Sequence, residues 1–131
     1  MKHLMLSLML IFLFIIAFSQ SDHQKESLIR EISQQKKKLQ ERPSDTKALS
    51  KIAMSYYKLS DMQSALAYYD RLIVLNPKAS GAYANRGVCR LLSGNKLGAC
   101  SDFIQSVVNG EDPKIIENKR LSEYVVVECK K

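Results

Sequence analysis

The chain has 131 residues, a net charge of +7 and two histidines, His3 and His23. This length fits a single domain. The sequence contains no HExxH, GxSxG, P-loop or glycine-rich dinucleotide pattern, so the familiar signatures of zinc, hydrolase and nucleotide chemistry are missing. We therefore expect a protein that is not an enzyme, with no catalytic residue, no cofactor and no metal ligand.

The first 19 residues have the layout of a secretory signal peptide. Lys2 supplies a short positive region, an apolar run extends from Leu4 to Phe18, and residues 17–19 (Ala-Phe-Ser) form a small-x-small cleavage site. The run is shorter than the roughly 20 residues that a membrane-spanning helix needs. We predict an exported protein, periplasmic or secreted, whose mature chain begins at Gln20 and does not span a membrane. The alternative is an uncleaved membrane anchor.

Residues 22–42 are expected to form a single leading helix. Leu28, Ile32 and Leu39 share one helical face, and the other faces are densely charged. The cluster Lys36–Lys38 could attract an anionic partner such as lipid headgroups or a cell-wall polymer. The simpler interpretation is a solvated helix face. Because the protein is expected to be exported, we do not expect nucleic acid among its partners.

The segment 46–77 predicts an antiparallel helix pair. Its apolar residues fall on two helical stripes, the first made of Leu49, Ile52, Ala53, Tyr56 and Leu59, the second of Met62, Ala65, Leu66, Tyr69, Leu72 and Ile73. The stripes are separated by Ser60 and Asp61, which are typical of a turn and a helix cap. Pro77 ends the second helix because proline has no N–H and restricts the residue before it.

A second copy of this pattern follows at 80–113, one constant period further along the chain. Its signature positions hold Tyr83, Gly87, Gly94, Ala99 and Phe103. It is polar at several places where the first copy is apolar, and we expect these side chains on a face that meets water, namely Arg86, Arg90 and Ser106. The pattern also puts the carboxylate of Asp102 at a cap or on an exposed face.

The period and the residues that recur with it resemble the tetratricopeptide repeat (TPR), a helix-turn-helix unit whose length matches this period. Leu49 stands at the family's large apolar site, Ala65 at its Ala site, Tyr69 at its Phe/Tyr site and Pro77 at its closing Pro. Ser60 departs from the family, which usually has Gly there. The resemblance covers one repeat strongly and a second more weakly.

This resemblance implies an all-α fold, a TPR-like α-solenoid of antiparallel helix pairs. The domain would span residues 20–131 and comprise the leading helix 22–42, the repeats 46–79 and 80–113, and a C-terminal capping helix 114–129. The valines at 125–127 favour a strand by propensity, but propensity yields to tertiary context.

In stacked repeats, the first helix of each pair lines a concave face. The register places seven side chains there, which we call the predicted groove: Lys47, Ser50, Met54, Tyr57, Asn85, Val88 and Leu91. Met and aromatic side chains suit an adaptable peptide groove, although Met54, Val88 and Leu91 could instead pack against the leading and capping helices. The family's carboxylate clamp is not supported, because Ser50 and Met54 stand where its Lys and second Asn would be needed.

The three cysteines are Cys89, Cys100 and Cys129, an odd number that leaves at least one unpaired within a monomer. All lie in the part expected to be exported, where disulfides persist. Cys100 begins a helix and Cys129 ends the capping helix, so antiparallel packing would bring them together. Small exported bacterial TPR proteins also resemble the chain here, with a GACSD-like segment. We hypothesise a Cys100–Cys129 disulfide; the alternatives are a Cys89–Cys100 bridge or three free thiols.

Together these features predict a non-enzymatic interaction module or scaffold of a bacterial cell envelope, which binds a peptide or helix of an unknown protein partner in its concave groove. The first alternative is a wall- or membrane-surface module that binds an anionic polymer through its basic N-terminal helix. The second is an accessory subunit whose concave face is permanently buried in an envelope complex.

Overall fold

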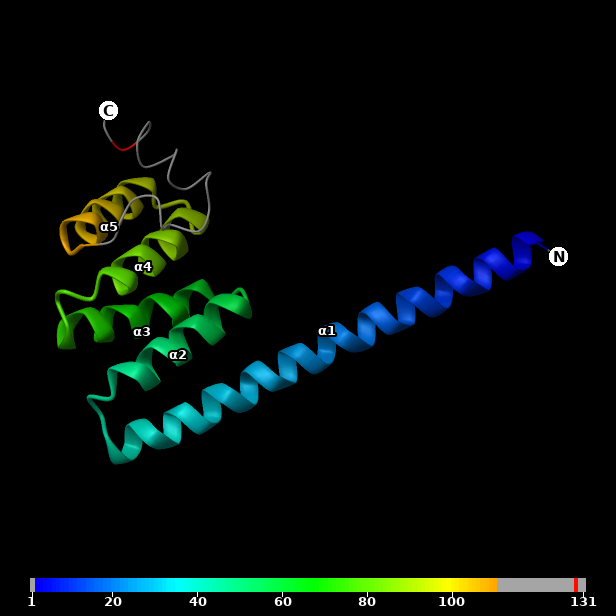
Figure 1. Ribbon diagram of the computed structural model, residues 1–131, viewed down its shortest axis with the longest axis horizontal. Helices are drawn as coiled ribbons and strands as arrows, with labels where there is room; N and C mark the ends of the chain where they lie inside the picture. The colour runs from blue at the N-terminus through cyan, green and yellow to red at the C-terminus, as the bar shows by residue number, and fades with distance from the viewer. Residues whose placement is uncertain (1, 111–128, 130–131) are drawn as a thin grey trace.

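The computed structural model describes residues 2–110 and Cys129 (Figure 1). This part of the chain forms five α-helices, α1 (Lys2–Glu41), α2 (Thr46–Lys58), α3 (Met62–Leu75), α4 (Ser80–Leu92) and α5 (Lys96–Val108). The predicted all-α class is therefore confirmed for the described residues. The predicted capping helix 114–129 lies outside them, apart from Cys129.

Helix α1 is continuous from Lys2 to Glu41 and includes both the predicted signal peptide and the predicted leading helix. Its second half packs against α2, and its first half projects away from the other helices (Figure 1). Ile32, Gln35 and Leu39 are the buried side chains of the packed half, so the polar Gln35 belongs to the buried face. Large apolar side chains of residues 5–14 are exposed along the projecting half.

None of the helices in the described part of the chain has the length and apolarity that crossing a membrane requires.

Helices α2 to α5 form a stack in which each helix packs against the next one along the chain (Figure 1). Leu49, Ile52 and Ala53 of α2 are fully buried against Ala65 and Tyr69 of α3. The two small residues allow the helix backbones to approach closely, and burial of the large side chains from water stabilises the pair. The apolar stripe of α3 therefore packs against the apolar stripe of α2, as the sequence pattern predicts.

The second helix pair repeats the first at a fixed spacing. Helices α2 and α4 begin at Thr46 and Ser80, and α3 and α5 begin at Met62 and Lys96, so the interval from one pair to the next is the same for both helices. The buried side chains Tyr69 of α3 and Phe103 of α5 are separated by this same interval. Local geometry therefore follows the period that the sequence pattern predicts.

The turns inside the two pairs also match. Ser60 and Gly94 both have left-handed backbone conformations, with φ of 61° and 83°. The next residue caps the following helix in each case, since Oδ1 of Asp61 accepts a hydrogen bond from Ser64 N–H at 3.0 Å, and Oδ1 of Asn95 accepts one from Gly98 N–H at 2.9 Å.

The close crossing of α4 and α5 depends on Gly87. A Cβ atom at Gly87 would lie 2.7 Å from Cε1 of Phe103, whose side chain is fully buried. Ala53 occupies the equivalent position of the first pair, one period earlier. The two pairs therefore require a small residue at the same place, and the second tolerates none larger than glycine without movement of the ring.

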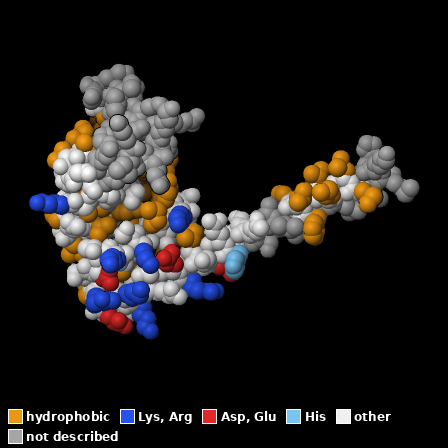
Figure 2. Space-filling view, viewed as in Figure 1, with side chains coloured by type: hydrophobic (Ala, Val, Ile, Leu, Met, Phe, Trp, Pro, Cys, Tyr) orange, Lys and Arg blue, Asp and Glu red, His pale blue; other side chains and the backbone are white. Residues whose placement is uncertain are grey.

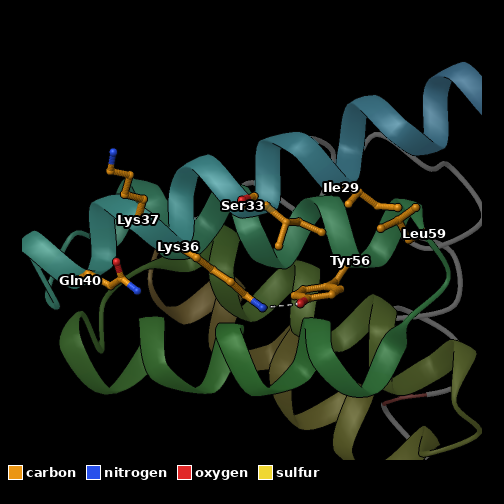
Figure 3. A pocket seen from close by; sticks show the side chains of 8 residues that line it. Ile29, Ser33, Lys36, Lys37, Gln40, Tyr56 and Leu59 are labelled. Atoms are coloured by element: carbon orange, nitrogen blue, oxygen red, sulfur yellow. Dashed lines mark hydrogen bonds between the residues drawn. The ribbon is translucent and has the colours of Figure 1, made fainter.

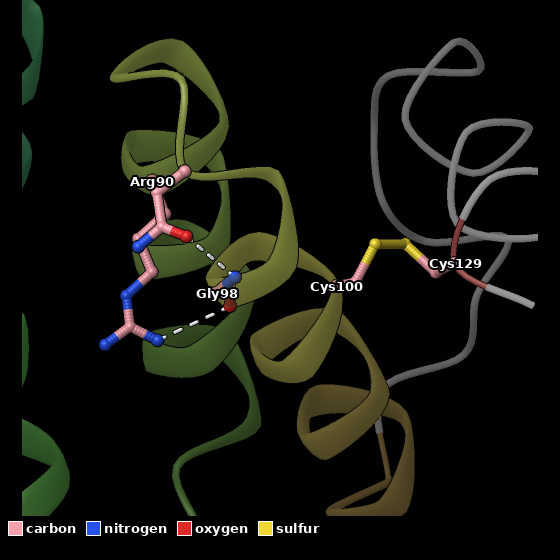
Figure 4. Close-up of a disulfide and its surroundings, with 5 residues drawn as sticks. Arg90, Gly98, Cys100 and Cys129 are labelled. Carbon is pink, nitrogen blue, oxygen red and sulfur yellow. Dashed lines mark hydrogen bonds between the residues drawn. A yellow bond between two sulfur atoms is a disulfide. The ribbon is translucent and has the colours of Figure 1, made fainter. Parts of the chain in front are cut away.

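Cys100 on α5 forms a disulfide with Cys129, as hypothesised from the sequence (Figure 4). Their Cα atoms lie 5.3 Å apart. Cys89 is a buried free thiol on α4, and this burial raises its pKa to about 11. The neutral thiol behaves as a small hydrophobic side chain.

The polar residues of the second pair are not where the sequence pattern places them. Asp102 is 2% exposed, so its expected position at a cap or on an exposed face is wrong. Arg86 and Arg90 do not face open water either, because both pair with Asp102. Ser106 is fully buried. Sequence pattern misses this because opposite charges from two helices can neutralise each other in an interior, which periodicity alone does not reveal.

Candidate functional site

The predicted groove residues lie on the two first helices of the pairs, Lys47 to Tyr57 on α2 and Asn85 to Leu91 on α4. Lys47 is exposed, and the other six side chains are half-buried. Met54 and Val88 are equivalent positions, as are Tyr57 and Leu91, and all four side chains are half-buried. These side chains are accessible on the surface of α2 and α4.

A separate hollow of about 600 Å³ lies between the second half of α1 and the end of α2. We call it the α1/α2 hollow. Its lining side chains come from three turns of α1 and one face of α2 (Figure 3): Ile29, Ile32, Ser33, Lys36, Lys37, Gln40, Tyr56 and Leu59. None of the predicted groove residues contributes to it.

Lys36 is fixed in this hollow by a tyrosine. Its side chain extends from α1 toward α2, and Nζ–H donates a hydrogen bond to the hydroxyl oxygen of Tyr56 at 2.9 Å (Figure 3). This hydrogen bond raises the pKa of Lys36, so the ammonium stays charged. The same Nζ lies 5.4 Å from the centroid of the Tyr56 ring, within the range of a cation–π contact.

The aromatic contact continues onto α3. The rings of Tyr56 and Tyr68 stack with centroids 5.8 Å apart, and Cζ of Arg71 lies 5.5 Å from the centroid of the Tyr68 ring. Lys36, Tyr56, Tyr68 and Arg71 thus form a row across three helices with a cation at each end. The row positions Tyr56 and, through it, Lys36.

The two ends of the α1/α2 hollow differ in chemistry. Ile29 and Leu59 lie side by side at one end, and Gln40 lies at the other end, where Lys37 points outward from the rim of the hollow (Figure 3). Ile29 is 52% exposed, so its side chain leaves apolar surface in contact with water at this end. The hollow therefore has an apolar end and a cationic, hydrogen-bonding end.

Positive charge also extends beyond the hollow. Lys and Arg side chains gather over the part of the stack where α1 ends, interspersed with a few acidic side chains (Figure 2). Lys36, Lys37 and Lys38 are all exposed, and within the described residues none of them forms an ion pair. The lysine cluster that the sequence singled out is thus available to an anionic partner.

Sequence reasoning identified the lysines but not the hollow. The signal was a stripe on α1, because Ile29, Ser33, Lys36 and Gln40 follow helical spacing. Its partner surface on α2, Tyr56 and Leu59, was interpreted as core, and both side chains are only half-buried. The association of the stripe with α2 depends on tertiary packing.

The other ionisable groups of the described residues are scattered or already paired. Within residues 2–110, no three His, Cys, Asp or Glu side chains gather as they would to hold a metal ion. Asp102 is the carboxylate with the most marked burial, and its oxygens are occupied by Arg86 and Arg90. Burial raises the pKa of Tyr69, which keeps its hydroxyl protonated in the core.

Comparison with protein families and with curated proteins adds no assignment: no family model matches the chain, and no curated protein matches it significantly.

Proposed function

We propose that this chain is an exported, TPR-like interaction module that binds another protein without chemistry of its own. The observation that supports this proposal is the recurrence of helix starts, left-handed turn residues and helix caps at one constant interval. Units that recur in this way stack in register, and stacked first helices present a continuous surface to a partner. The assignment to the TPR family is part of the proposal.

The partner of this proposal is a peptide or helix that lies across α2 and α4. Half-buried Met54, Tyr57, Val88 and Leu91 supply apolar contact, and the amide of Asn85 supplies hydrogen bonds. Such side chains lose little additional freedom on binding because packing already restricts them. Binding here would not depend strongly on ionic strength.

The test compares the wild-type protein with Tyr57→Ala/Asn85→Ala as bait in an envelope extract, with mild crosslinking and mass spectrometry. The matched control is Lys51→Ala/Lys96→Ala, which removes two exposed side chains of α2 and α5 outside the predicted groove. We expect a protein recovered by wild type and control to be lost with the groove variant. Equal recovery with all three baits would exclude the groove as its site.

A second candidate function is attachment to an anionic wall polymer or membrane surface through the N-terminal helix. The three exposed lysines at 36–38, which lack ionic partners within the described residues, favour it. Sedimentation with purified wall polymer distinguishes the two functions, because polymer binding should weaken steeply between low and high salt. Binding that persists at high salt would contradict this candidate.

Export is a proposal of its own. The test is Edman sequencing of the protein recovered from the cell envelope or the medium of its host. We expect the mature chain to begin at Gln20. An intact N-terminus in the membrane fraction would instead indicate an uncleaved anchor.

A further inference from the structure

The α1/α2 hollow lies outside the predicted groove. Its two ends would bind different groups of a single ligand, one apolar and one anionic. The apolar end is formed by Ile29 and Leu59, with Ile32 buried beneath them. Exposed apolar surface of this kind gains free energy when another apolar group covers it. A ligand that carried only charge would leave this end in contact with water.

The cationic end is already ordered. The ammonium of Lys36 is held by Tyr56 at 2.9 Å and still has two further N–H donors. Because Tyr56 is itself stacked on Tyr68, the position of Lys36 is fixed before a ligand arrives. Preorganisation of a charged donor reduces the entropy cost of binding an anion.

The adjacent side chains extend this end. Lys37 and Gln40 lie one and four residues further along α1 and remain exposed. Together with Lys36 they offer several N–H donors and two positive charges, which complement carboxylates. Within the described residues no acidic side chain pairs with either lysine.

From this juxtaposition we propose that the α1/α2 hollow binds an acidic peptide segment in which a large apolar side chain lies next to one or two carboxylates. The apolar side chain fills the end between Ile29 and Leu59, one carboxylate binds Lys36 near Gln40, and Lys37 attracts a second carboxylate at the rim of the hollow. This site rests on the proposed role as an interaction module, but it does not depend on the groove across α2 and α4.

Charge complementarity and the apolar end together select a peptide over other anions. A wall polymer presents repeated charges without apolar side chains, so it would gain nothing from Ile29 and Leu59. A flat headgroup surface would contact the exposed lysines without entering a hollow of about 600 Å³. A peptide supplies both kinds of group at the spacing of neighbouring residues.

The experiment measures binding to the full chain by fluorescence anisotropy. A mild non-ionic detergent is present because large apolar side chains of residues 5–14 are exposed. The probes are fluorescein-labelled peptides with blocked ends, in which one leucine precedes a pair of glutamates, either directly or after a short glycine or serine spacer. A matched set replaces both glutamates by glutamine, and another replaces the leucine by serine.

Two protein variants test the two ends. Lys36→Gln/Lys37→Gln removes the charges, and Ile29→Ser removes apolar surface from an exposed position, so both should fold. The control Lys51→Gln/Lys96→Gln loses the same charge at exposed sites away from the hollow. Far-UV circular dichroism and thermal unfolding verify that each variant is folded.

We expect the best glutamate peptide to lose about tenfold in affinity with Lys36→Gln/Lys37→Gln, and several-fold with Ile29→Ser. The control and Tyr57→Ala/Asn85→Ala should bind as the wild type does. Failure of every peptide to bind, or equal loss with the charge control, would overturn the proposal. Competition by phosphatidylglycerol in the micelles, with no loss in Ile29→Ser, would overturn it in favour of a headgroup.

The result separates this site from the groove. Loss of extract partners with Tyr57→Ala/Asn85→Ala tests the groove alone, whereas the peptide experiment tests the hollow alone. Peptide binding that disappears in the groove variant but survives in Lys36→Gln/Lys37→Gln would contradict the hollow and support the groove.

Discussion

The two helix pairs share the same backbone arrangement, but different side-chain interactions stabilise them. In the first pair, Tyr56 of α2 stacks on Tyr68 of α3 with ring centroids 5.8 Å apart. The equivalent residues of the second pair, one period later, are Arg90 and Asp102, whose charged atoms lie 2.9 Å apart. An aromatic contact and an ion pair thus occupy the same place in the fold.

The two pairs also differ one helical turn earlier in α2 and α4. Ile52 of the first pair is fully buried, and its equivalent is Arg86. Arg86 donates to both oxygens of Asp102, at 2.9 Å from Nε and 2.6 Å from Nη2, and to Asp70 of α3 at 2.6 Å. A bidentate pair of this kind has fixed geometry, whereas an isoleucine accepts many neighbours. The second pair is therefore the more specific of the two, and the more sensitive to loss of one partner.

The largest effect should follow removal of the shared carboxylate. Asp102→Ala leaves two mostly buried guanidinium groups without their main partner, so we expect a loss of about 3 kcal/mol in the free energy of unfolding. Urea denaturation measures it. Asp70→Ala, at a carboxylate 55% exposed, should cost less than about 1 kcal/mol. Equal costs for the two variants would show that burial does not control this network.

An exchange sharpens the same comparison. Arg86→Ile/Arg90→Tyr/Asp102→Tyr gives the second pair the residues of the first. Replacement of a whole buried ionic group by apolar residues is often neutral or stabilising. We expect this triple variant to be more stable than Asp102→Ala in the same urea denaturation. A triple variant no more stable than Asp102→Ala would mean that the second pair cannot accept the packing of the first.

The disulfide is a second feature that belongs to the second pair alone among the described residues. The bridge joins Cys100 and Cys129, 29 positions apart. Its loss in Cys100→Ser/Cys129→Ser should cost roughly 3 kcal/mol, because the unfolded chain gains the freedom of the opened loop. Differential scanning calorimetry with and without reductant tests this. Reductant should leave the melting temperature of the double variant unchanged; a decrease would indicate an intermolecular disulfide of Cys89, the one cysteine that remains.

An exchange of small residues should destabilise both helix crossings, for different physical reasons. Gly87→Ala places a Cβ 2.7 Å from the buried Phe103 ring and should cost about 1–3 kcal/mol, although alanine is the better helix former. Ala53→Gly in the first pair should cost about 1–2 kcal/mol, because glycine is the poorer helix former and the fully buried methyl group is lost. If the clash is responsible, Phe103→Leu should recover part of the stability of Gly87→Ala; no recovery would argue against it.

Substitutions in the two equivalent turns, at Ser60 and Gly94, should change the free energy of unfolding by smaller amounts and in opposite directions. Ser60 has a left-handed backbone with φ of 61°, where a side chain costs about 1 kcal/mol, so Ser60→Gly should be neutral or stabilising by up to that amount. Gly94→Ser, at φ of 83°, should destabilise by a similar amount. Chemical denaturation of both variants measures the two changes. Effects of the same sign would mean that side-chain contacts, not backbone conformation, decide these positions.

The smallest predicted effect is a difference in pH dependence between the two caps. Backbone N–H of Ser64 donates to the Asp61 carboxylate and holds its pKa below the usual value. A depressed folded-state pKa means that this stabilisation is present above the pKa of the unfolded chain and is lost as pH falls below the ordinary range of an aspartate and through the folded value. Asn95, the equivalent cap, does not titrate.

Thermal unfolding of wild type and Asp61→Asn across this range provides the measurement. We expect the melting temperature of the variant to fall less steeply with acid than that of the wild type. Asp45 caps α2 and titrates in the same way, so it must be left intact in both proteins. Parallel curves would show that the Asp61 cap does not contribute to acid sensitivity.

Local chemistry was readable from the sequence alone. Caps, turns and helix ends depend on residues at most four positions apart, such as Asp61 with Ser64, so their signals lie within one short window. The apolar stripes and the need for a small residue at Gly87 follow from helical spacing and the recurring period. These features predict the all-helical class of the described residues and the turns at Ser60 and Gly94.

Only the tertiary structure determined whether each polar side chain faces water or a partner in the interior. Arg86 and Asp102 are 16 positions apart on different helices, and Lys36 and Tyr56 are 20 apart. Whether such a charge faces water or a partner depends on which helices pack together, which the local pattern does not contain. Asp102 therefore became a buried ionic centre, and a helix face that looked merely solvated became one wall of the α1/α2 hollow.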